Sequence, residues 1–285
     1  MVVWVNLLAA ILAGCDLLQG AGSVDLRLQL DWRDNRLSIL SPLLPGGRVE
    51  VLYLEAFCRR GSTGRRWEDT VIPHHTTRID GAGPAKEVRL RTEVAGHVEV
   101  LHRIRARREG VLFELTVRNA GSQYADVEWF QPCIQVASFT GSDQNEYTKQ
   151  CFLFTDDGLR HLSDLPRAEE ALYKGGQVYV PAGVNPEDVN PRPISTVRPA
   201  NGLIGCFSSD GRWILATAWD RTQELFQGVL VCIHADPRIG GLQPGETKRL
   251  KGCIYLIPND VSLLTRLYRR DFPRGSFGSN AVRSR

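Results

Sequence analysis

The sequence predicts an all-β protein, a large antiparallel β-sandwich with a short C-terminal helix. Apolar and polar residues alternate with a period of two along most of the chain, which is the pattern of strands that bury one face. Glycine, proline and asparagine separate these alternating segments at short intervals, as they do between the strands of sandwiches and barrels. A helical spacing of apolar residues occurs only near the end of the chain. These observations favour two packed sheets.

The first predicted strand covers residues 24–32, where alternate apolar side chains share one face. The same alternation predicts a strand in each of the segments 47–57, 87–94, 97–108, 110–119, 125–138, 150–156, 177–183, 202–209, 212–219, 224–235 and 248–257.

The helix is predicted after Asp260, a residue type that caps helix N-termini. Val261, Leu264, Leu267 and Tyr268 then fall on one stripe. Between residues 156 and 201 the alternation weakens, and the stretch 184–201 is a long loop rich in proline and asparagine. Long loops inside a compact domain are more often functional than idle.

Length and composition indicate one globular domain over residues 16–285. The formal net charge of +3 gives no sign of nucleic-acid binding. Residues 1–15 form an apolar run with the length of a signal-peptide core. Its end, Leu12–Cys15, resembles the lipobox of bacterial lipoproteins, which implies export and membrane attachment through a lipidated Cys15. The alternative is that this run is the buried first element of a cytoplasmic domain.

The cysteine and histidine spacings predict no metal site and no cofactor. None of the seven cysteines forms a CxxC pair, and several lie in apolar runs typical of buried free thiols. His74 and His75 are adjacent, so on a regular strand they point to opposite faces and cannot share one metal ion. The same parity argument separates His97 from His102.

The segment 228–258 carries the best candidate for chemistry. His234 and Asp236 share parity on a predicted strand, about 7 Å apart, so that one can act as a base and the other can orient it. Glu224, near a strand start in the preceding stretch 218–228, is a further candidate base. The alternative is that Asp236 simply begins a turn with Pro237.

Three segments resemble the galactose mutarotase-like supersandwich, which aldose 1-epimerases and several polysaccharide lyases share. They are residues 41–56, 115–134 and 232–256. The resemblance implies a carbohydrate ligand. It places the histidine–proline pair of that family on Gln131 and Pro132, where glutamine cannot act as a general acid, and the catalytic carboxylate near His234 or Asp236.

The resemblance also implies a sugar-binding cleft. Its predicted lining residues outside the catalytic group are Trp129, Gln131 and Arg238 from the strands and Asn190 and Arg192 from the long loop. The stretch 67–78 can contribute to the mouth of this cleft. There Trp67 would stack on a sugar, and one of His74 and His75 would serve the site while the other is structural. The alternative for Trp67 is a packing role.

Two functions remain open on the sequence alone. One is an epimerase-like or lyase-like enzyme that acts on a sugar or a uronate-containing glycan, with His234, His75 or Glu224 as the base. Arginines such as Arg103, which belongs to an alternating basic stripe, can attract an anionic glycan. The other is a carbohydrate-binding or structural sandwich that carries out no reaction.

Overall fold

The computed structural model describes residues 25–171 and 176–274. The predicted leader, with Cys15, lies outside these residues, so export and lipidation stay predictions. Within the part of the chain that is described, no helix has the length and the apolar character needed to cross a membrane.

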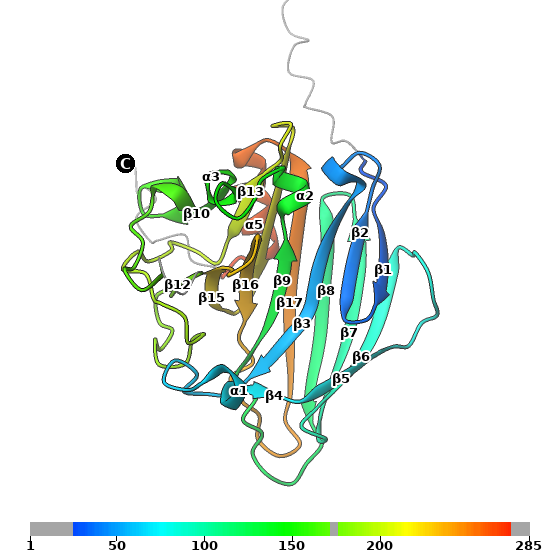
Figure 1. Cartoon of the computed structure of the whole chain (residues 1–285). Helices are drawn as coiled ribbons and strands as arrows, with labels where there is room; N and C mark the ends of the chain where they lie inside the picture. The colour runs from blue at the N-terminus through cyan, green and yellow to red at the C-terminus, as the bar shows by residue number, and fades with distance from the viewer. Residues whose placement is uncertain (1–24, 172–175, 275–285) are drawn as a thin grey trace, which may run out of the picture.

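Two antiparallel sheets pack face to face, which confirms the predicted all-β sandwich (Figure 1). Sheet A has the strand order β1-β2-β3-β9-β16-β15-β12, with β4 beside β3. Sheet B has the order β11-β10-β13-β14-β17-β8-β7-β6-β5. The strands of sheet A are β1 (Gln29–Arg33), β2 (Arg36–Leu40), β3 (Arg48–Cys58), β4 (Val71–Ile72), β9 (Trp129–Gln135), β12 (Gln177–Tyr179), β15 (Thr222–Gln227) and β16 (Cys232–Pro237).

Sheet B supplies the other wall of the core. Its strands are β5 (His74–Arg78), β6 (Glu87–Val94), β7 (Val98–Arg107), β8 (Gly110–Asn119), β10 (Cys151–Thr155), β11 (Gly158–His161), β13 (Ile204–Phe207), β14 (Trp213–Trp219) and β17 (Thr247–Pro258). The short helical turns are η1 (Pro45–Gly47), α1 (Trp67–Thr70), α2 (Ala137–Thr140), α3 (Tyr147–Gln150) and η2 (Leu162–Asp164).

The core lies between the sheets and follows from the alternation in the sequence. On β7, Val98, Val100 and Ile104 are fully buried, whereas Leu101 points outward and is 42% exposed. Tyr53 of β3 in sheet A meets Phe113 of sheet B, with ring centroids 5.4 Å apart. The strand period of two therefore decides which side chains enter the core.

The C-terminal helix α5 (Val261–Asp271) begins where the sequence predicts it. The Asp260 side chain accepts a hydrogen bond from the backbone N–H of Leu263 at 2.9 Å, as an N-cap does. The apolar stripe of α5, with Leu264 and Tyr268, packs on outward-facing side chains of sheet B such as Tyr255. Helix α5 thus covers part of the outer face of sheet B.

The single strand predicted over residues 224–235 is wrong. The structure has two strands there, β15 and β16, joined by a turn at residues 228–231. The backbone N–H of Gly228 donates to the carbonyl oxygen of Cys232 at 3.0 Å, which closes the turn. Val229 and Leu230 in this turn are exposed. Because they are apolar, the sequence pattern continues through the turn and predicts one strand instead of two.

Candidate functional site

A cluster of ionisable side chains lies on the outer face of sheet A. It belongs to the strands β9, β16 and β15, which are neighbours in the sheet (Figure 1). The pairs Ile233↔Ile134 and Trp129↔Arg238 set the register of β9 and β16. By this register Cys133 lies opposite His234, and Gln131 lies opposite Asp236. On the other side, Glu224 of β15 pairs with Asp236.

His234 and Asp236 lie on the same face, as their parity predicts. His234 Nδ1 is 3.7 Å from Asp236 Oδ1, and His234 Nε2 is 3.3 Å from Cys232 Sγ. His234 is 2% exposed and Asp236 is fully buried. Burial disfavours a charged imidazole, but the negative charges of Cys232 and Asp236 outweigh it and raise the pKa of His234.

Glu224 completes a buried carboxyl pair with Asp236. Neither side chain is exposed, and one oxygen of Glu224 accepts a hydrogen bond from the backbone N–H of Asn190 at 2.8 Å. Burial raises the pKa of both carboxyl groups, and at Glu224 the charge of Asp236 adds to the rise. Burial therefore favours the protonated form of both carboxyl groups.

Two thiols adjoin the histidine. Cys133 Sγ lies within 4.8 Å of Cys232 Sγ, and the neighbouring Cys133 and His234 lower the pKa of Cys232 to about 5. The neighbouring Cys232 and burial raise the pKa of Cys133. Cys133 and Cys232 are each 4% exposed and form no disulfide. The cluster thus combines thiol, imidazole and carboxyl groups on two paired strands.

A bulge in β3 brings a further carboxyl group, Glu55, to this face. The pairs Leu52↔Cys133 and Ala56↔Gln131 leave three residues of β3 opposite the single Pro132. Pro132 has no backbone N–H to donate to β3, so no hydrogen bond from Pro132 is lost where β3 bulges. Within the bulge, Leu54 has a φ of 64°, a strained value for leucine of the kind that often marks functional sites.

Glu55 differs from the other acids because its side chain is exposed. Its carboxyl group is nonetheless partly desolvated, and this desolvation raises its pKa, while the positive charge of His234 acts in the opposite direction. Glu55 is therefore the acid of the cluster that a molecule from solvent can reach.

The other predicted strand residues lie beside the cluster. Trp129 is fully buried, and its indole N–H donates to Ser62 Oγ at 3.2 Å. Gln131 is 2% exposed. Arg238 pairs with the buried Glu128, with Nη2 2.8 Å from Oε1.

The long loop closes one end of this face. Its Val189 packs against Val178 and Phe226 of sheet A. Asn190 is buried and reaches Glu224 through its backbone, whereas Arg192 is half-buried in the same loop.

The stretch 67–78 borders this face and then passes to sheet B. Its strand β4 pairs with β3 in sheet A, and Val71 packs against the group formed by Ala56, Cys58 and Trp129. His74 and His75 belong to β5, the edge strand of sheet B. The half-buried His74 places Nε2 3.0 Å from the carbonyl oxygen of Leu54, whereas His75 is exposed and pairs with Glu93. The two rings thus point to opposite sides, as predicted. Trp67 lies in α1 and is 37% exposed.

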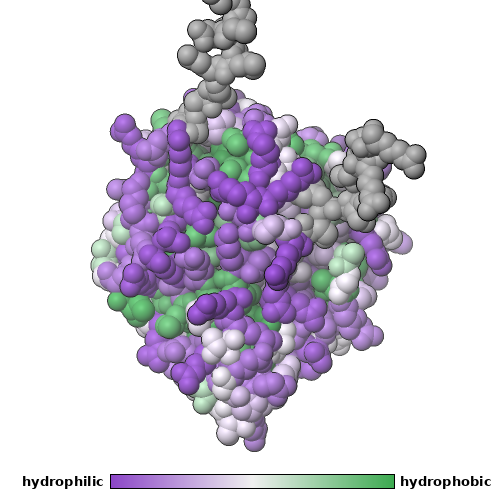
Figure 2. All heavy atoms as spheres, turned by 180° about the vertical axis from the view of Figure 1, so that it is seen from behind, coloured by the Kyte–Doolittle hydropathy of each residue, from purple (hydrophilic) through white to green (hydrophobic). Residues whose placement is uncertain are grey.

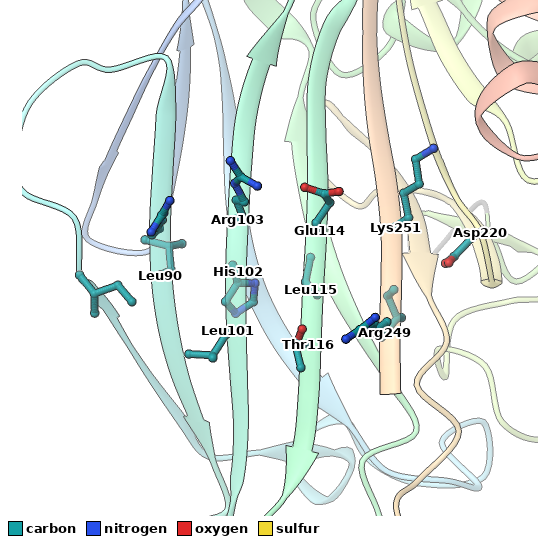
Figure 3. A pocket seen from close by; sticks show the side chains of 13 residues that line it. Leu90, Leu101, His102, Arg103, Glu114, Leu115, Thr116, Asp220, Arg249 and Lys251 are labelled. Carbon is teal, nitrogen blue, oxygen red and sulfur yellow. The ribbon is translucent and has the colours of Figure 1, made fainter. Parts of the chain in front are cut away.

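A separate groove of about 720 Å³ runs over the outer face of sheet B (Figure 3). Seen from behind, the molecule shows mainly hydrophilic side chains with smaller hydrophobic areas between them (Figure 2). Many charges around the groove are already paired: Arg103 Nε is 2.9 Å from Glu87 Oε2, and Arg105 Nη2 is 2.7 Å from Glu114 Oε2. The groove lacks the concentration of buried ionisable groups found on sheet A.

Sequence reasoning missed Glu55, Cys133 and Cys232 as site residues. The signal that could have found Glu55 is Pro132, because a proline within a central strand indicates a bulge. The two cysteines have no such signal, since only the pairing of β9 with β16 brings them together.

No model of a known protein family and no curated protein matches the chain. Some solved structures resemble it. A galactose mutarotase-like protein from Lactobacillus casei is 11% identical, covers 80% of this chain and 99% of its own, and has a TM-score of 0.43. A galactose 1-epimerase from Lactobacillus acidophilus is 11% identical, covers 81% of this chain and 76% of its own, and has a TM-score of 0.31. An alpha-N-acetylgalactosaminidase from Bifidobacterium bifidum, in a GalNAc complex, is 13% identical, covers 87% of this chain and 38% of its own, and has a TM-score of 0.45.

These similarities concern the course of the chain and carry no argument about its family, its activity or its ligand.

Proposed function

We propose that this chain binds a carbohydrate on the outer face of sheet A and transfers protons there, as an epimerase-like or lyase-like enzyme. The observation that carries the proposal is the cluster of Glu55, His234, Asp236 and Glu224 on one face, with Glu55 exposed. The ligand class comes from the sequence segments 41–56, 115–134 and 232–256.

Glu55 is the proton-transfer group of this proposal. Epimerisation and β-elimination both need a base beside the sugar, and a carboxyl group with a raised pKa is suited to give and take protons near neutral pH. Two of the three bases expected from the sequence, His234 and Glu224, are almost fully buried, and the third, His75, lies in β5 of sheet B. A substrate that arrives from solvent therefore meets Glu55 first, with the charge of His234 behind it.

A sugar panel tests the ligand class. The midpoint of thermal unfolding is measured with monosaccharides, uronic acids, and neutral and sulfated polysaccharides, because a ligand that binds only the folded state raises the midpoint. We expect one sugar class to raise it. No shift with any member of the panel would refute the carbohydrate ligand.

The substitution Glu55→Gln then tests the chemistry. Turnover of the sugar that binds should fall about 100-fold or more, while binding of that sugar is largely retained. The matched control is Glu50→Gln, which changes a carboxyl group on the regular part of β3 that accepts a hydrogen bond from Ser38. Unchanged turnover in Glu55→Gln would show that Glu55 is not the group that transfers the proton.

The second candidate is a carbohydrate-binding protein that carries out no reaction. Gln131 favours it, because a buried glutamine stands where the mutarotase-like motif has its histidine. Sugar binding by the wild-type chain without any turnover would decide for this candidate.

A further inference from the structure

Three metal-ligand donors converge on the outer face of sheet A. One ligand atom each from Cys133, Cys232 and His234 lies within 4.8 Å of the others. All three side chains are buried. Cys133 belongs to β9 and is far in the sequence from Cys232 and His234 of β16, and the pairing of β9 with β16 brings the three together.

We propose that Cys133, Cys232 and His234 bind a soft or borderline transition-metal ion of the Zn²⁺ type. The two sulfur atoms bind it as thiolates and His234 binds it through Nε2. This site goes beyond the proposed function and does not depend on it, since metal binding needs neither a sugar nor proton transfer.

The spacing of the donors fits such an ion. Zinc binds sulfur at about 2.3 Å and imidazole nitrogen at about 2.0–2.1 Å, so neighbouring ligand atoms of a tetrahedral site lie about 3.5–3.8 Å apart. The 3.3 Å between Cys232 Sγ and His234 Nε2 needs only a small adjustment to reach this range. A set of two sulfurs and one imidazole binds Zn²⁺ or Cu⁺ in preference to Mg²⁺ or Ca²⁺.

Asp236 stands where a metal-bound histidine needs a partner. A ligating histidine usually donates its other N–H to a carboxylate, which fixes the ring and its tautomer. His234 Nδ1 is 3.7 Å from Asp236 Oδ1, and among the described residues neither atom has another side-chain or backbone hydrogen-bond partner. An ion on Nε2 would favour the tautomer with the proton on Nδ1, directed at Asp236.

A divalent ion also balances the charge of its own ligands. Two buried thiolates are costly unless a positive charge compensates them. The two positive charges of a divalent ion match the two thiolates, while His234 binds the ion as a neutral imidazole.

Gly228 keeps the space around these donors free. A Cβ atom at this position would lie 2.1 Å from Cys232 Sγ and 3.2 Å from His234 Nε2. Any larger residue would therefore push the thiol away from the imidazole.

Titration with Co²⁺ tests the site. The full chain is reduced, freed of metal by a chelator and titrated with Co²⁺, which absorbs visible light strongly when it is tetrahedral and bound by thiolates. We expect saturation at one equivalent, with sulfur-to-cobalt charge-transfer absorption, and loss of the bands when Zn²⁺ is added. The absence of these bands in the wild-type chain would overturn the proposal, as would a thiol count that shows a Cys133–Cys232 disulfide under these reducing conditions.

Variants assign the ligands. Cys133→Ser and Cys232→Ser should each abolish the charge-transfer bands or weaken binding about 100-fold, and Asp236→Asn should weaken it roughly 10–100-fold. Cys206→Ser is the matched control, because it removes a buried thiol of sheet B and should bind Co²⁺ like the wild type. Unchanged bands in both cluster variants would refute the assignment. Far-UV circular dichroism confirms that each variant is folded.

The metal and sugar results can fail separately. Co²⁺ binding without any effect of the sugar panel leaves the metal site standing and refutes the carbohydrate ligand. Sugar binding by a chain that takes up no Co²⁺ leaves the proposed function standing and refutes the metal site.

Discussion

His102 is a buried histidine that joins the two sheets. Its Nδ1 is 2.9 Å from the hydroxyl oxygen of Tyr53 in sheet A, and its Nε2 is 3.0 Å from the hydroxyl oxygen of Thr92 in sheet B. A neutral imidazole has one donor and one acceptor nitrogen, so both hydroxyl contacts can be satisfied without charge. Burial lowers the pKa of His102 to about 3.

This depressed pKa predicts a loss of stability in acid. The unfolded chain takes up the proton near pH 6.5, whereas the folded protein takes it up only near pH 3. The contribution of neutral His102 is therefore complete above pH 6.5 and is lost as the pH falls towards 3, by at most about 5 kcal/mol. Denaturant unfolding at several pH values between 7 and 4 measures this slope.

His102→Gln is the comparison for this slope. Glutamine keeps a donor and an acceptor but does not titrate, so the variant should lose stability less steeply with falling pH than the wild type. Parallel slopes in the two proteins would show that His102 is not the group responsible.

At the scale of single residues, the sequence could place His234 and Asp236 on one face, because alternation along a strand is a local property. It could not place Glu55 beside them, because a bulge depends on what the partner strand offers, here Pro132. It also could not join Cys133 to Cys232, because strand register is set by pairing and not by spacing. Trp67 and one of His74 and His75 were predicted at the mouth of the cleft from the chemistry of their side chains. Trp67 lies in α1, and both histidines lie in β5 of sheet B.

Among the elements, α5 offers a clear test of local sequence rules. Replacing Asp260 by Ala removes the acceptor for the Leu263 N–H and should lower the free energy of unfolding by about 1 kcal/mol. Asp260→Ser should restore most of this loss, since serine also caps helices. Urea denaturation of the three proteins measures the difference. Equal losses in both variants would mean that the cap itself contributes nothing.

Strands with clean alternation were predicted almost to the residue, as β6 and β8 show. The prediction failed at residues 224–235 because the turn between β15 and β16 is itself apolar. Apolar character alone does not distinguish a buried strand from an exposed turn, and only Gly228 indicated the break. Element boundaries are thus visible where turns are polar and hidden where they are not.

Across the whole molecule, the central strands pair with partners far away in the sequence. β3 pairs with β9, β9 with β16, and β8 with β17. Neither sheet can be completed until most of the chain is in place, because the late strands β16 and β17 enter the middle of the two sheets. Topologies of this kind fold slowly, in milliseconds to seconds or longer.

The shared core predicts that the two sheets unfold as one unit. A single hydrophobic cluster contains side chains of both, among them Val51 and Ile134 from sheet A and Val100 and Leu215 from sheet B. Loss of either sheet would expose the inner face of the other, so a half-folded state should be too unstable to accumulate.

Native-state hydrogen exchange tests this cooperativity. In the regime where exchange reports opening free energies, peptides from β9 and β16 and peptides from β8 and β17 should give the same value in their slowest amides, equal to the free energy of global unfolding. The edge strands β5 and β11 should exchange faster and serve as the internal reference for local opening. If one sheet gave a value lower than the other by about 2 kcal/mol or more, the molecule would contain two folding units, and the shared core would not be what couples them.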